Sequence, residues 1–361
     1  MKTSSFSILV RSPNWIGDQI LAYPFFYYLR KNFPNARITV ACVSWVADIQ
    51  FRDLVDEIII LPKPEGPGLW QKMRAVFNAG KSASAQGKWD LGISLPNSFS
   101  SAVYLYLAKC RRRRGYRTDG RTLFLNEGQP WEKARSLHRS QAYLELLPGE
   151  IPRAHLRHAT EFWGVPAEDK ESPDLPGEEK SFNQSRSWPA RQLVIPVTVK
   201  KYWVLAPGAT ADSRRWPLDR FGQLVETIHQ KTGWRGIVVG GPKETEIAEW
   251  LCSRHPNALV DYTAQGSVSG LAEIFRRAQF TVCNESGLAH VASLCGSKVH
   301  IVCGAADPRR TRPIGPGPVS VTFNPVECWP CEKNICLQAQ GKQLQCLLGI
   351  TSERVWEEIH L

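Results

Sequence analysis

Short apolar runs alternate with longer amphipathic stretches along the first half of this chain, and this alternation restricts the fold more than any other feature. The runs cover residues 6–11, 37–43, 57–61 and 90–95. Apolar runs of this length predict buried strands, and the stretches between them have the period of helices. Strands that alternate with helices predict a parallel sheet covered by helices.

The same rhythm begins again after a polar segment, residues 166–196, which is rich in Pro, Glu, Lys and Ser and has no sustained period. Such segments are typical of connections between domains. Further strands are expected at 203–206, 236–239, 280–283 and 299–303, with helices near 219–231, 243–255 and from Ser286 onward, and a last helix over 351–361 capped by Thr351 or Ser352. A chain of 361 residues suits two domains. We therefore predict two α/β domains, over residues 1–178 and 179–361.

Charge, hydropathy and cysteine content limit the location and the partners. The net charge of +11 should attract phosphates, nucleic acid or an acidic membrane face. The most continuous apolar run, residues 20–29, contains Pro24 and is too short to cross a bilayer, and the N-terminus lacks the pattern of an export signal. Ten cysteines spread through strand-like and helix-like segments fit a reducing cytoplasm.

The first strand leads directly into Ser-Pro-Asn-Trp-Ile-Gly-Asp, residues 12–18, and then into a helix that Pro24 must shorten or kink. Ligands of open α/β sheets bind at the carboxyl ends of strands, and Gly17 would allow a close approach. Asp18 would then face a ligand crevice. Asp18 as a cap of the helix is the alternative, and the two roles are compatible.

The corresponding loop of the second half, residues 206–217, combines small residues with Thr210, Arg214 and Arg215. Guanidinium groups match the geometry of phosphate oxygens, and backbone amides beside a Gly can add to the site. The loop therefore suits a diphosphate, and a solvated basic loop is the alternative. After the next strand, Glu244 could accept hydrogen bonds from ribose hydroxyls or act as a first-turn Glu of its helix.

Residues 284–290, Asn-Glu-Ser-Gly-Leu-Ala-His, follow a third strand and begin a helix. Free amides at a helix N-terminus with Gly287 make an anion site. A carboxylate at Glu285 is awkward beside a diphosphate, so it should face sugar hydroxyls or cap the helix. His290 lies four residues after Ser286, on the same helix face, where a lone His is usually structural.

Two further clusters leave alternatives open. Four thiols lie within nineteen residues, at Cys328, Cys331, Cys336 and Cys346. They could hold a structural zinc ion or pack a turn as free thiols, and four thiolates would leave no open position for catalysis. The arginine run at 111–114 belongs on a solvated face or meets acceptor phosphates or anionic lipid. A basic, zinc-containing nucleic-acid-binding protein would use both clusters, but it would explain none of the strand-end loops.

Taken in order, these segments resemble the ADP-heptose:lipopolysaccharide heptosyltransferase family, glycosyltransferase family 9, over nearly the whole chain. The heptosyltransferase II branch is the most similar. The segments are Asn-Trp-Ile-Gly-Asp at 14–18, Leu-Pro-Asn-Ser-Phe-Ser-Ser-Ala at 95–102, Arg-Gly-Tyr-Arg at 114–117, Pro-Gly-Ala at 207–209, Arg-Arg-Trp-Pro at 214–217, and residues 240–244 and 284–290.

The resemblance implies a GT-B fold, an α/β architecture of two Rossmann-like domains whose parallel sheets face each other across a cleft. The N-terminal half would bind the acceptor, the inner core of lipopolysaccharide, and the C-terminal half would bind ADP-heptose. The enzyme would act in the cytoplasm at the inner face of the inner membrane, as a peripheral protein without nucleic acid as a partner.

The resemblance also implies roles for single residues. Asp18 would be the general base of an inverting single displacement that needs no metal, and Arg214 would bind the donor phosphates. The other expected donor-site residues are Thr210, Arg215, Glu244, Glu285, Ser286, Gly287 and His290, and the acceptor-site residues are Asn14, Gly17, Asn97 and Ser98. The family usually has Asp at position 285, so a glycosyltransferase of this fold with another nucleotide-sugar donor or acceptor is the alternative.

Overall fold

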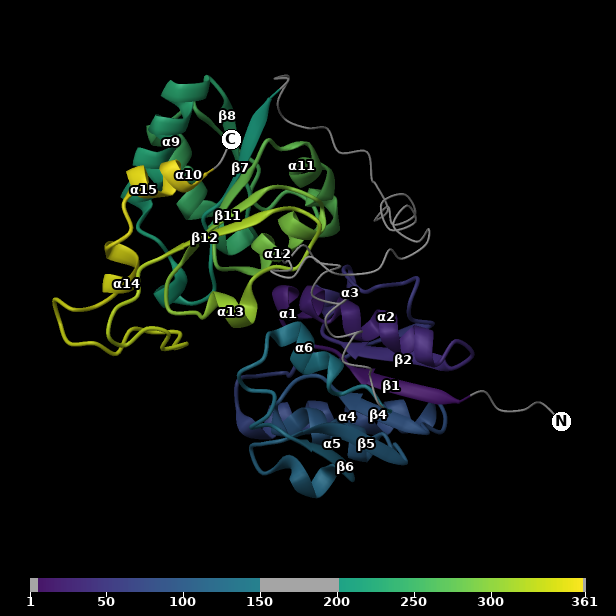
Figure 1. The fold of residues 1–361 in the computed structure, drawn as a ribbon. Coiled ribbons are helices and arrows are strands. Elements are labelled where there is room, and N and C mark those ends of the chain that lie inside the picture. Colours follow the sequence, from purple (N-terminus) through teal and green to yellow (C-terminus); the bar gives the residue numbers. More distant parts are fainter. Residues whose placement is uncertain (1–5, 150–200, 360–361) are drawn as a thin grey trace, which may run out of the picture. The chain divides into compact units, whose positions relative to one another are not determined.

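The computed structural model describes residues 6–149 and 201–359, and these ranges belong to two compact units, each with its own sheet (Figure 1). The predicted domain boundary between residues 178 and 179 and the predicted polar connection lie outside the described residues.

The first unit contains a six-stranded sheet in which every neighbouring pair of strands is parallel. The strands are β1 (Ser7–Arg11), β2 (Arg37–Cys42), β3 (Glu57–Ile60), β4 (Leu91–Ser94), β5 (Arg112–Arg117) and β6 (Glu127–Pro130), in the order β3-β2-β1-β4-β5-β6. The helices are α1 (Ile16–Leu21), α2 (Tyr23–Asn32), α3 (Ser44–Ala47), α4 (Leu69–Ala85), α5 (Phe99–Leu107) and α6 (Arg139–Leu144), with a 3-10 turn at Arg121–Phe124. Helices lie on both faces of the sheet (Figure 1).

Four of these strands are confirmed sequence predictions, and Pro24 has the expected effect. α1 ends at Leu21 and α2 begins at Tyr23, with Pro24 in its first turn, where the missing amide proton costs nothing. β5 and β6 were not expected because their sequences, Arg-Arg-Arg-Gly-Tyr-Arg and Glu-Gly-Gln-Pro, lack the apolar pattern of a buried strand. Pairing with β4 recruits β5 into the sheet.

The second unit repeats this architecture. Its strands are β7 (Tyr202–Ala206), β8 (Arg235–Val238), β9 (Leu259–Asp261), β10 (Thr281–Asn284), β11 (Val299–Cys303) and β12 (Val319–Phe323), all parallel, in the order β12-β11-β10-β7-β8-β9. Its helices are α9 (Leu218–Thr232), α10 (Thr245–Arg254), α11 (Ala272–Arg277), α12 (Gly287–Leu294), α13 (Pro308–Thr311), α14 (Gln345–Leu348) and α15 (Ser352–Glu358). Numbered within each unit, both sheets have the Rossmann strand order 3-2-1-4-5-6. The prediction of two Rossmann-like α/β domains is therefore confirmed.

The C-terminal segment completes the core of the second unit. The Thr351 hydroxyl accepts a 3.2 Å hydrogen bond from the Arg354 amide, which confirms the predicted cap of the last helix. Ile350 and Val355 are fully buried against the core that contains Trp216. The Trp216 indole donates a 3.1 Å hydrogen bond to the Ile350 carbonyl. The tail therefore anchors the end of the loop that follows β7.

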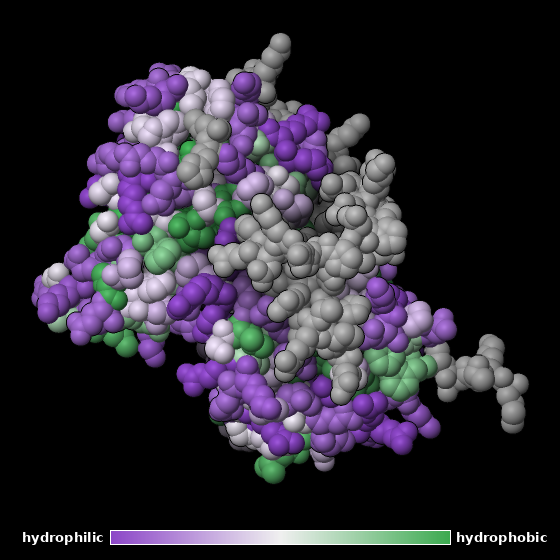
Figure 2. All heavy atoms as spheres, viewed as in Figure 1, coloured by the Kyte–Doolittle hydropathy of each residue, from purple (hydrophilic) through white to green (hydrophobic). Residues whose placement is uncertain are grey.

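The surface is largely polar. Among residues 6–149 and 201–359, we find no helix with the length and apolar character that crossing a membrane would require. Hydrophilic residues cover most of the face seen in Figure 2, and hydrophobic residues occur on it in small groups.

Candidate functional site

The carboxyl ends of β7, β10 and β11 lie at one edge of the second sheet, because these strands are parallel neighbours. Three loops that begin there therefore meet: residues 207–217 after β7, residues 285–286 after β10 and residues 304–307 after β11. This edge is where open α/β sheets bind ligands.

A single buried side chain fixes the loop after β7. Asn284, the last residue of β10, is fully buried. Its side-chain nitrogen donates a 2.6 Å hydrogen bond to the Pro207 carbonyl, and its side-chain oxygen accepts a 3.0 Å hydrogen bond from the backbone amide of Trp216. Because one side chain binds both ends of the loop, residues 208–215 are held between two fixed ends. The sequence placed Asn284 in the motif but gave no signal for this bridging role.

Arg214 and Glu285 form the central ion pair of this edge. Nη1 of Arg214 lies 2.9 Å from Oε2 of Glu285, whose side chain is only 10% exposed, whereas that of Arg214 is 31% exposed. The prediction that Glu285 might cap α12 is wrong, since Ser286 occupies the N-cap position. Partial neutralisation by Arg214 explains how a buried carboxylate can lie at the edge where an anionic ligand is expected.

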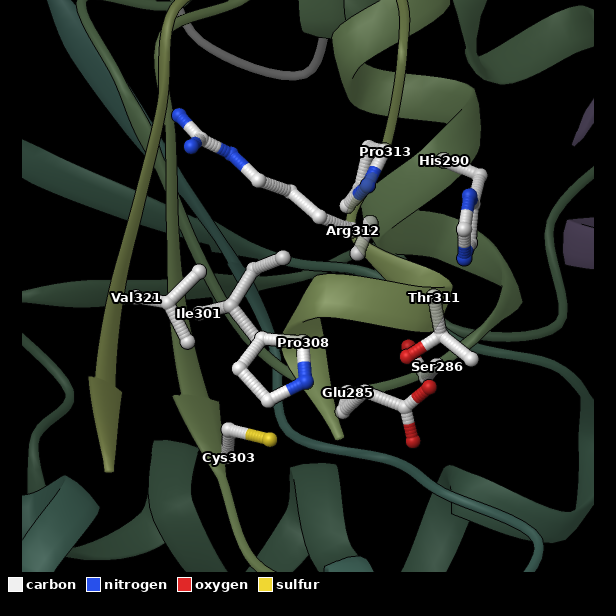
Figure 3. A pocket seen from close by; sticks show the side chains of 11 residues that line it. Glu285, Ser286, His290, Ile301, Cys303, Pro308, Thr311, Arg312, Pro313 and Val321 are labelled. Atoms are coloured by element: carbon white, nitrogen blue, oxygen red, sulfur yellow. The ribbon is translucent and has the colours of Figure 1, made fainter. Parts of the chain in front are cut away.

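Glu285 and Ser286 open onto a small pocket, together with His290 from α12 and Thr311 from α13 (Figure 3). The side-chain oxygens of Glu285, Ser286 and Thr311 gather on one side of the pocket. The opposite side is lined by Ile301, Cys303, Pro308 and Val321, and the Arg312 side chain extends toward the same side. The space between these side chains, with open solvent included, is about 240 Å³. The pocket is therefore a small open hollow rather than a cavity that encloses a whole ligand.

The N-terminus of α12 retains capacity for a ligand. Ser286 is extended and makes no side-chain cap, and within the described residues its buried hydroxyl oxygen has no hydrogen-bond partner. The first helix residue is Gly287, so backbone amides at this end are not screened by a side chain. His290 lies one turn further on, 4% exposed, and lines the same pocket as Ser286, as the four-residue spacing predicts.

Two other expected donor-site residues help to shape the loop itself. Arg215 donates a 2.7 Å hydrogen bond to the Ala209 carbonyl and pairs with Asp212 at 2.9 Å. Oε2 of Glu244 accepts a 2.7 Å hydrogen bond from the Gly241 amide. Glu244 also packs against Gly208, where an added Cβ would lie 2.4 Å from its Cγ. The local role expected for Glu244 is thus present, and its contact with ribose stays a prediction. Thr210 is exposed at the surface of the loop.

Asp18 lies in the first unit, in the first turn of α1 at the carboxyl edge of β1. The N-cap is Trp15, so the alternative in which Asp18 caps the helix is wrong. Nε of Arg139, from α6, lies 3.7 Å from Oδ1 of Asp18, and both side chains are 29% exposed. Burial, and secondarily the charge of Asp18, raises the pKa of Tyr143 well above its usual value.

The neighbouring loops of this edge are held by buried arginines. Arg11 donates a 2.5 Å hydrogen bond to the Asn14 side chain, and the Trp45 indole donates to the Asn14 carbonyl at 2.7 Å. Gly17 is buried within the turn. Arg121, fully buried, donates to the Asn97 side chain at 2.9 Å and to the Pro96 carbonyl at 2.5 Å.

Ser98 is the exposed N-cap of α5, beside Asn97. Because β1 and β4 are parallel neighbours, the loops with Asn14, Gly17, Asp18, Asn97 and Ser98 share one sheet edge. The structure thus brings together all five residues that the sequence assigned to the first half.

Comparison with known proteins gives the family. Residues 81–340, well over half of the chain, match the sequence profile of glycosyltransferase family 9 (heptosyltransferase). The chain belongs to glycosyltransferase family 9. Lipooligosaccharide heptosyltransferase 2 of Haemophilus ducreyi is 25% identical over 366 residues, and the alignment covers 98% of each chain. Lipopolysaccharide heptosyltransferase 2 of Salmonella typhimurium is 24% identical over 367 residues, which cover 98% of this chain and 97% of that relative.

Solved structures agree with this family 9 glycosyltransferase in fold. The structure of Escherichia coli ADP-heptose lipopolysaccharide heptosyltransferase II superposes with a TM-score of 0.71 at 21% identity, covering 98% of this chain and 97% of the other. An E. coli heptosyltransferase WaaC structure with ADP gives a TM-score of 0.65 at 18% identity, with 98% of each chain covered. The protein is thus a glycosyltransferase with the two Rossmann-like domains of the GT-B fold.

The arginine run of this family 9 glycosyltransferase is largely committed to internal contacts. Arg112 pairs with Glu127 at 2.5 Å, Arg113 donates to the Phe124 carbonyl at 2.7 Å, and Arg114 donates to the Leu146 carbonyl at 2.8 Å. These guanidinium groups hold the edge strands and adjacent turns together.

The four-cysteine tail packs without disulfides, since all ten cysteines of the chain are free. Burial and the three other thiols of the tail raise the pKa of Cys346, so the four sulfurs lie close enough to interact electrostatically. In the part of the chain that the structure describes, however, no group of three or more His, Cys, Asp or Glu side chains is arranged to hold a metal ion. Structural zinc at Cys328, Cys331, Cys336 and Cys346 therefore stays a prediction that this arrangement does not support.

Three residues of the two edges were not predicted from the sequence: Arg139 beside Asp18, Arg121 in contact with Asn97, and Thr311 in the pocket. Arg121 and Arg139 lie far along the chain from their partners, so no local pattern could connect them. For Thr311 a signal existed. Asp307-Pro308 follows a strand and begins a helix, and the Asp307 side chain accepts a hydrogen bond from the Arg309 amide.

Proposed function

We propose that this glycosyltransferase transfers heptose from ADP-L-glycero-D-manno-heptose to the inner core of lipopolysaccharide, the heptosyltransferase II reaction. The observation that carries the proposal is the Arg214–Glu285 pair next to the N-terminus of α12. It supplies a cation and free amides for a diphosphate, and a carboxylate for sugar hydroxyls, at one sheet edge. Full-length similarity to proteins named heptosyltransferase 2 supports the same donor and acceptor.

The second unit would hold the donor. As the bond between the anomeric carbon and the phosphate oxygen breaks, negative charge grows on the departing ADP. The Arg214 guanidinium and the amides near Gly287 would stabilise that charge, so the reaction needs no divalent metal. The Glu285 carboxylate would accept hydrogen bonds from the sugar hydroxyls within the pocket of Figure 3, and the Ser286 and Thr311 hydroxyls could donate or accept.

The first unit would hold the acceptor and supply the base. Asp18 takes the proton of the acceptor hydroxyl, whose oxygen forms a bond to the anomeric carbon on the face opposite the departing ADP. That carbon is therefore inverted, and the proton remains on the Asp18 carboxyl group until it passes to solvent. Arg139, 3.7 Å away, would orient the carboxylate. The enzyme would work in the cytoplasm, at the inner face of the inner membrane where such an acceptor lies.

A second candidate keeps the fold and the reaction but changes the donor or acceptor sugar. The observation that favours it is Glu285, because the family usually has Asp there. Glu has one methylene more than Asp, so its carboxylate would take a different position in the pocket and would contact a different hydroxyl.

The decisive experiment is an assay of the purified protein with ADP-heptose and a core saccharide that ends in heptose, with ADP release and product mass as readouts. We expect one heptose to be added, with inversion at the anomeric centre. A parallel panel of nucleotide sugars addresses the second candidate. Turnover of another sugar nucleotide but not of ADP-heptose would replace the first proposal by the second, and no turnover with any donor would refute both.

A further inference from the structure

α4 of the first unit presents one face that the described residues of that unit leave exposed. Only Ala79, Gly80 and Ala83 of this seventeen-residue helix are buried, and they pack with α5 on the sheet. The opposite face carries Trp70, which is 88% exposed, and Phe77, which is 44% exposed. Large aromatic side chains so open to water are not needed for the core.

The exposed aromatic residues alternate with cations along a single stripe. Trp70, Arg74, Phe77 and Lys81 follow the spacing i, i+4, i+7, i+11, which places them on one side of a helix. The Lys81 ammonium lies 4.5 Å from the centroid of the Phe77 ring. Leu69, 76% exposed, extends the apolar surface at the start of the helix. We call Leu69, Trp70, Arg74, Phe77 and Lys81 the α4 stripe.

The surroundings of the α4 stripe are basic. Between residues 61 and 85 the sequence has Lys63, Lys72, Arg74 and Lys81 and a single acidic residue, Glu65. Glu65 reaches Arg74 only at 3.9 Å, and both side chains are more than 70% exposed. Exposed pairs of this kind are weak, so the stripe retains its positive charge.

We propose that the α4 stripe docks this protein on an anionic phospholipid bilayer. Aromatic side chains with cations on the same helix face are the pattern of helices that lie in the interface of a membrane, where the rings enter the headgroup region and the cations meet lipid phosphates. The arginine run at 111–114 is the obvious alternative, but the guanidinium groups of Arg112, Arg113 and Arg114 are engaged within the protein.

α4 begins near the sheet edge to which we assign the acceptor, so docking through α4 would place that edge at the membrane. α4 follows β3, and β3, β2 and β1 are parallel, so the helix begins at the sheet edge that also carries Asn14 and Asp18. Docking through the first turn of α4 would bring that edge to the surface in which a lipid-linked acceptor is embedded. This part of the inference rests on the proposed function, whereas bilayer binding itself does not.

The test measures binding of the full-length protein to sedimented vesicles, without any substrate. Vesicles of phosphatidylethanolamine with phosphatidylglycerol are compared with vesicles of phosphatidylcholine alone. We expect the wild-type protein to bind the anionic vesicles and the variants Trp70→Gln/Phe77→Gln and Arg74→Glu/Lys81→Glu to bind at least about tenfold more weakly. The matched controls, Leu337→Gln, at a side chain 78% exposed in the second unit, and Lys231→Glu, exposed on α9, should bind like the wild type.

Three outcomes would overturn the proposal: no binding of the wild-type protein to anionic vesicles, unchanged binding of both stripe variants, or equal binding to phosphatidylcholine. Sedimentation velocity without lipid tests the other possible occupant, a second copy of this chain. If the stripe paired two copies, the Trp70→Gln/Phe77→Gln variant would have a lower apparent mass than the wild type. Circular dichroism of each variant checks that it is folded, which we expect because the substituted side chains are exposed.

A second experiment, on enzyme kinetics, distinguishes a failure of this inference from a failure of the proposed function. With a soluble, delipidated acceptor, the stripe variants should keep the wild-type kcat/KM, and with acceptor embedded in vesicles their KM should rise about tenfold at unchanged kcat. If ADP-heptose is not turned over at all, the proposed function fails while vesicle binding still decides the role of the stripe.

Discussion

At the scale of single residues, the two sheet edges differ in how they hold charge. Asp18 is 29% exposed and has an arginine at 3.7 Å. Glu285 is nearly buried and contacts Arg214 directly at 2.9 Å. An exposed carboxylate suits a group that must exchange a proton with solvent, and a buried pair suits a fixed binding surface.

Replacement of Asp18 by Asn should lower kcat by about 10²–10⁴-fold, the usual contribution of a general base. The side chain keeps its shape and loses only its ability to take a proton. Steady-state kinetics with the core acceptor measure the loss, and thermal stabilisation by ADP, which concerns the second unit, should not change. Near-normal turnover of the variant would remove Asp18 from the mechanism.

Replacement of Arg214 by Ala should raise the KM for the donor and lower kcat, because both the bound diphosphate and the departing ADP lose a cation. It also removes a cation 2.9 Å from the buried Glu285 carboxylate, which should lower stability by at most the about 3–5 kcal/mol that breaking a buried ion pair costs. Arg214→Ala/Glu285→Gln is the control: it should recover stability without recovering kcat. Recovery of both would show that Arg214 acts only on the fold.

At the scale of elements, a frame of close contacts sets the shape of the donor edge. Asn284 joins the two ends of the loop after β7, and Glu244 from the turn after β8 packs on Gly208 within it. Strand β10 and the turn after β8 thus support a loop that has little structure of its own. Substitutions in this frame should therefore change nucleotide binding by altering the shape of the loop.

Gly208→Ala should destabilise the second unit by about 1–3 kcal/mol and weaken ADP binding, since the new Cβ would lie 2.4 Å from Cγ of Glu244. Urea unfolding and thermal shift with ADP measure the two effects. In a Glu244→Ala background the obstructing atoms are gone, so the same Gly208→Ala change should cost much less. Additive effects of the two substitutions would contradict the contact.

At the scale of the whole molecule, two similar sheets carry unlike loops. Both have the Rossmann strand order, yet the loops of the first place a carboxylate and amide side chains at its edge, and those of the second place an ion pair and a helix N-terminus at its edge. The proposed division of acceptor and donor between the units rests on these loops rather than on the strand order.

ADP alone should therefore slow hydrogen exchange in the second unit, at residues 207–217 and 284–290, and leave the amides of residues 14–18 and 95–102 unchanged. The physical reason is that binding stabilises the segments that contact the ligand against local opening. Mass-spectrometric exchange of the intact protein measures both regions at once. Protection of residues 14–18 by ADP would contradict the assignment of the donor to the second unit.

Dialysis against EDTA should leave turnover intact, since Arg214 and helix amides are proposed to stabilise the departing ADP without a metal. Metal analysis of the same samples shows whether the four-cysteine tail holds zinc. A loss of activity that Mg²⁺ restores would contradict the metal-free mechanism. Loss of zinc with unchanged kcat but a lower melting temperature would assign the metal a structural role.

The sequence by itself determined the two parallel sheets, because runs of apolar residues separated by amphipathic helices can be buried in few other ways. It also placed Asp18, Arg214, Glu285 and Ser286 at strand ends, since a loop after a parallel strand must lie at the carboxyl edge. Each of these conclusions depends on short-range periodicity, which a single sequence contains in full.

Only the tertiary structure decided which side chains meet. Arg139 reaches Asp18 over 121 positions of sequence, Asn284 reaches Pro207 over 77, and the arginines of β5 turn inward to Glu127 and to backbone carbonyls. The α4 stripe likewise became evident only when packing showed which face of the helix is covered. Such contacts depend on strand order and helix rotation, and neither is encoded in the local pattern of residues.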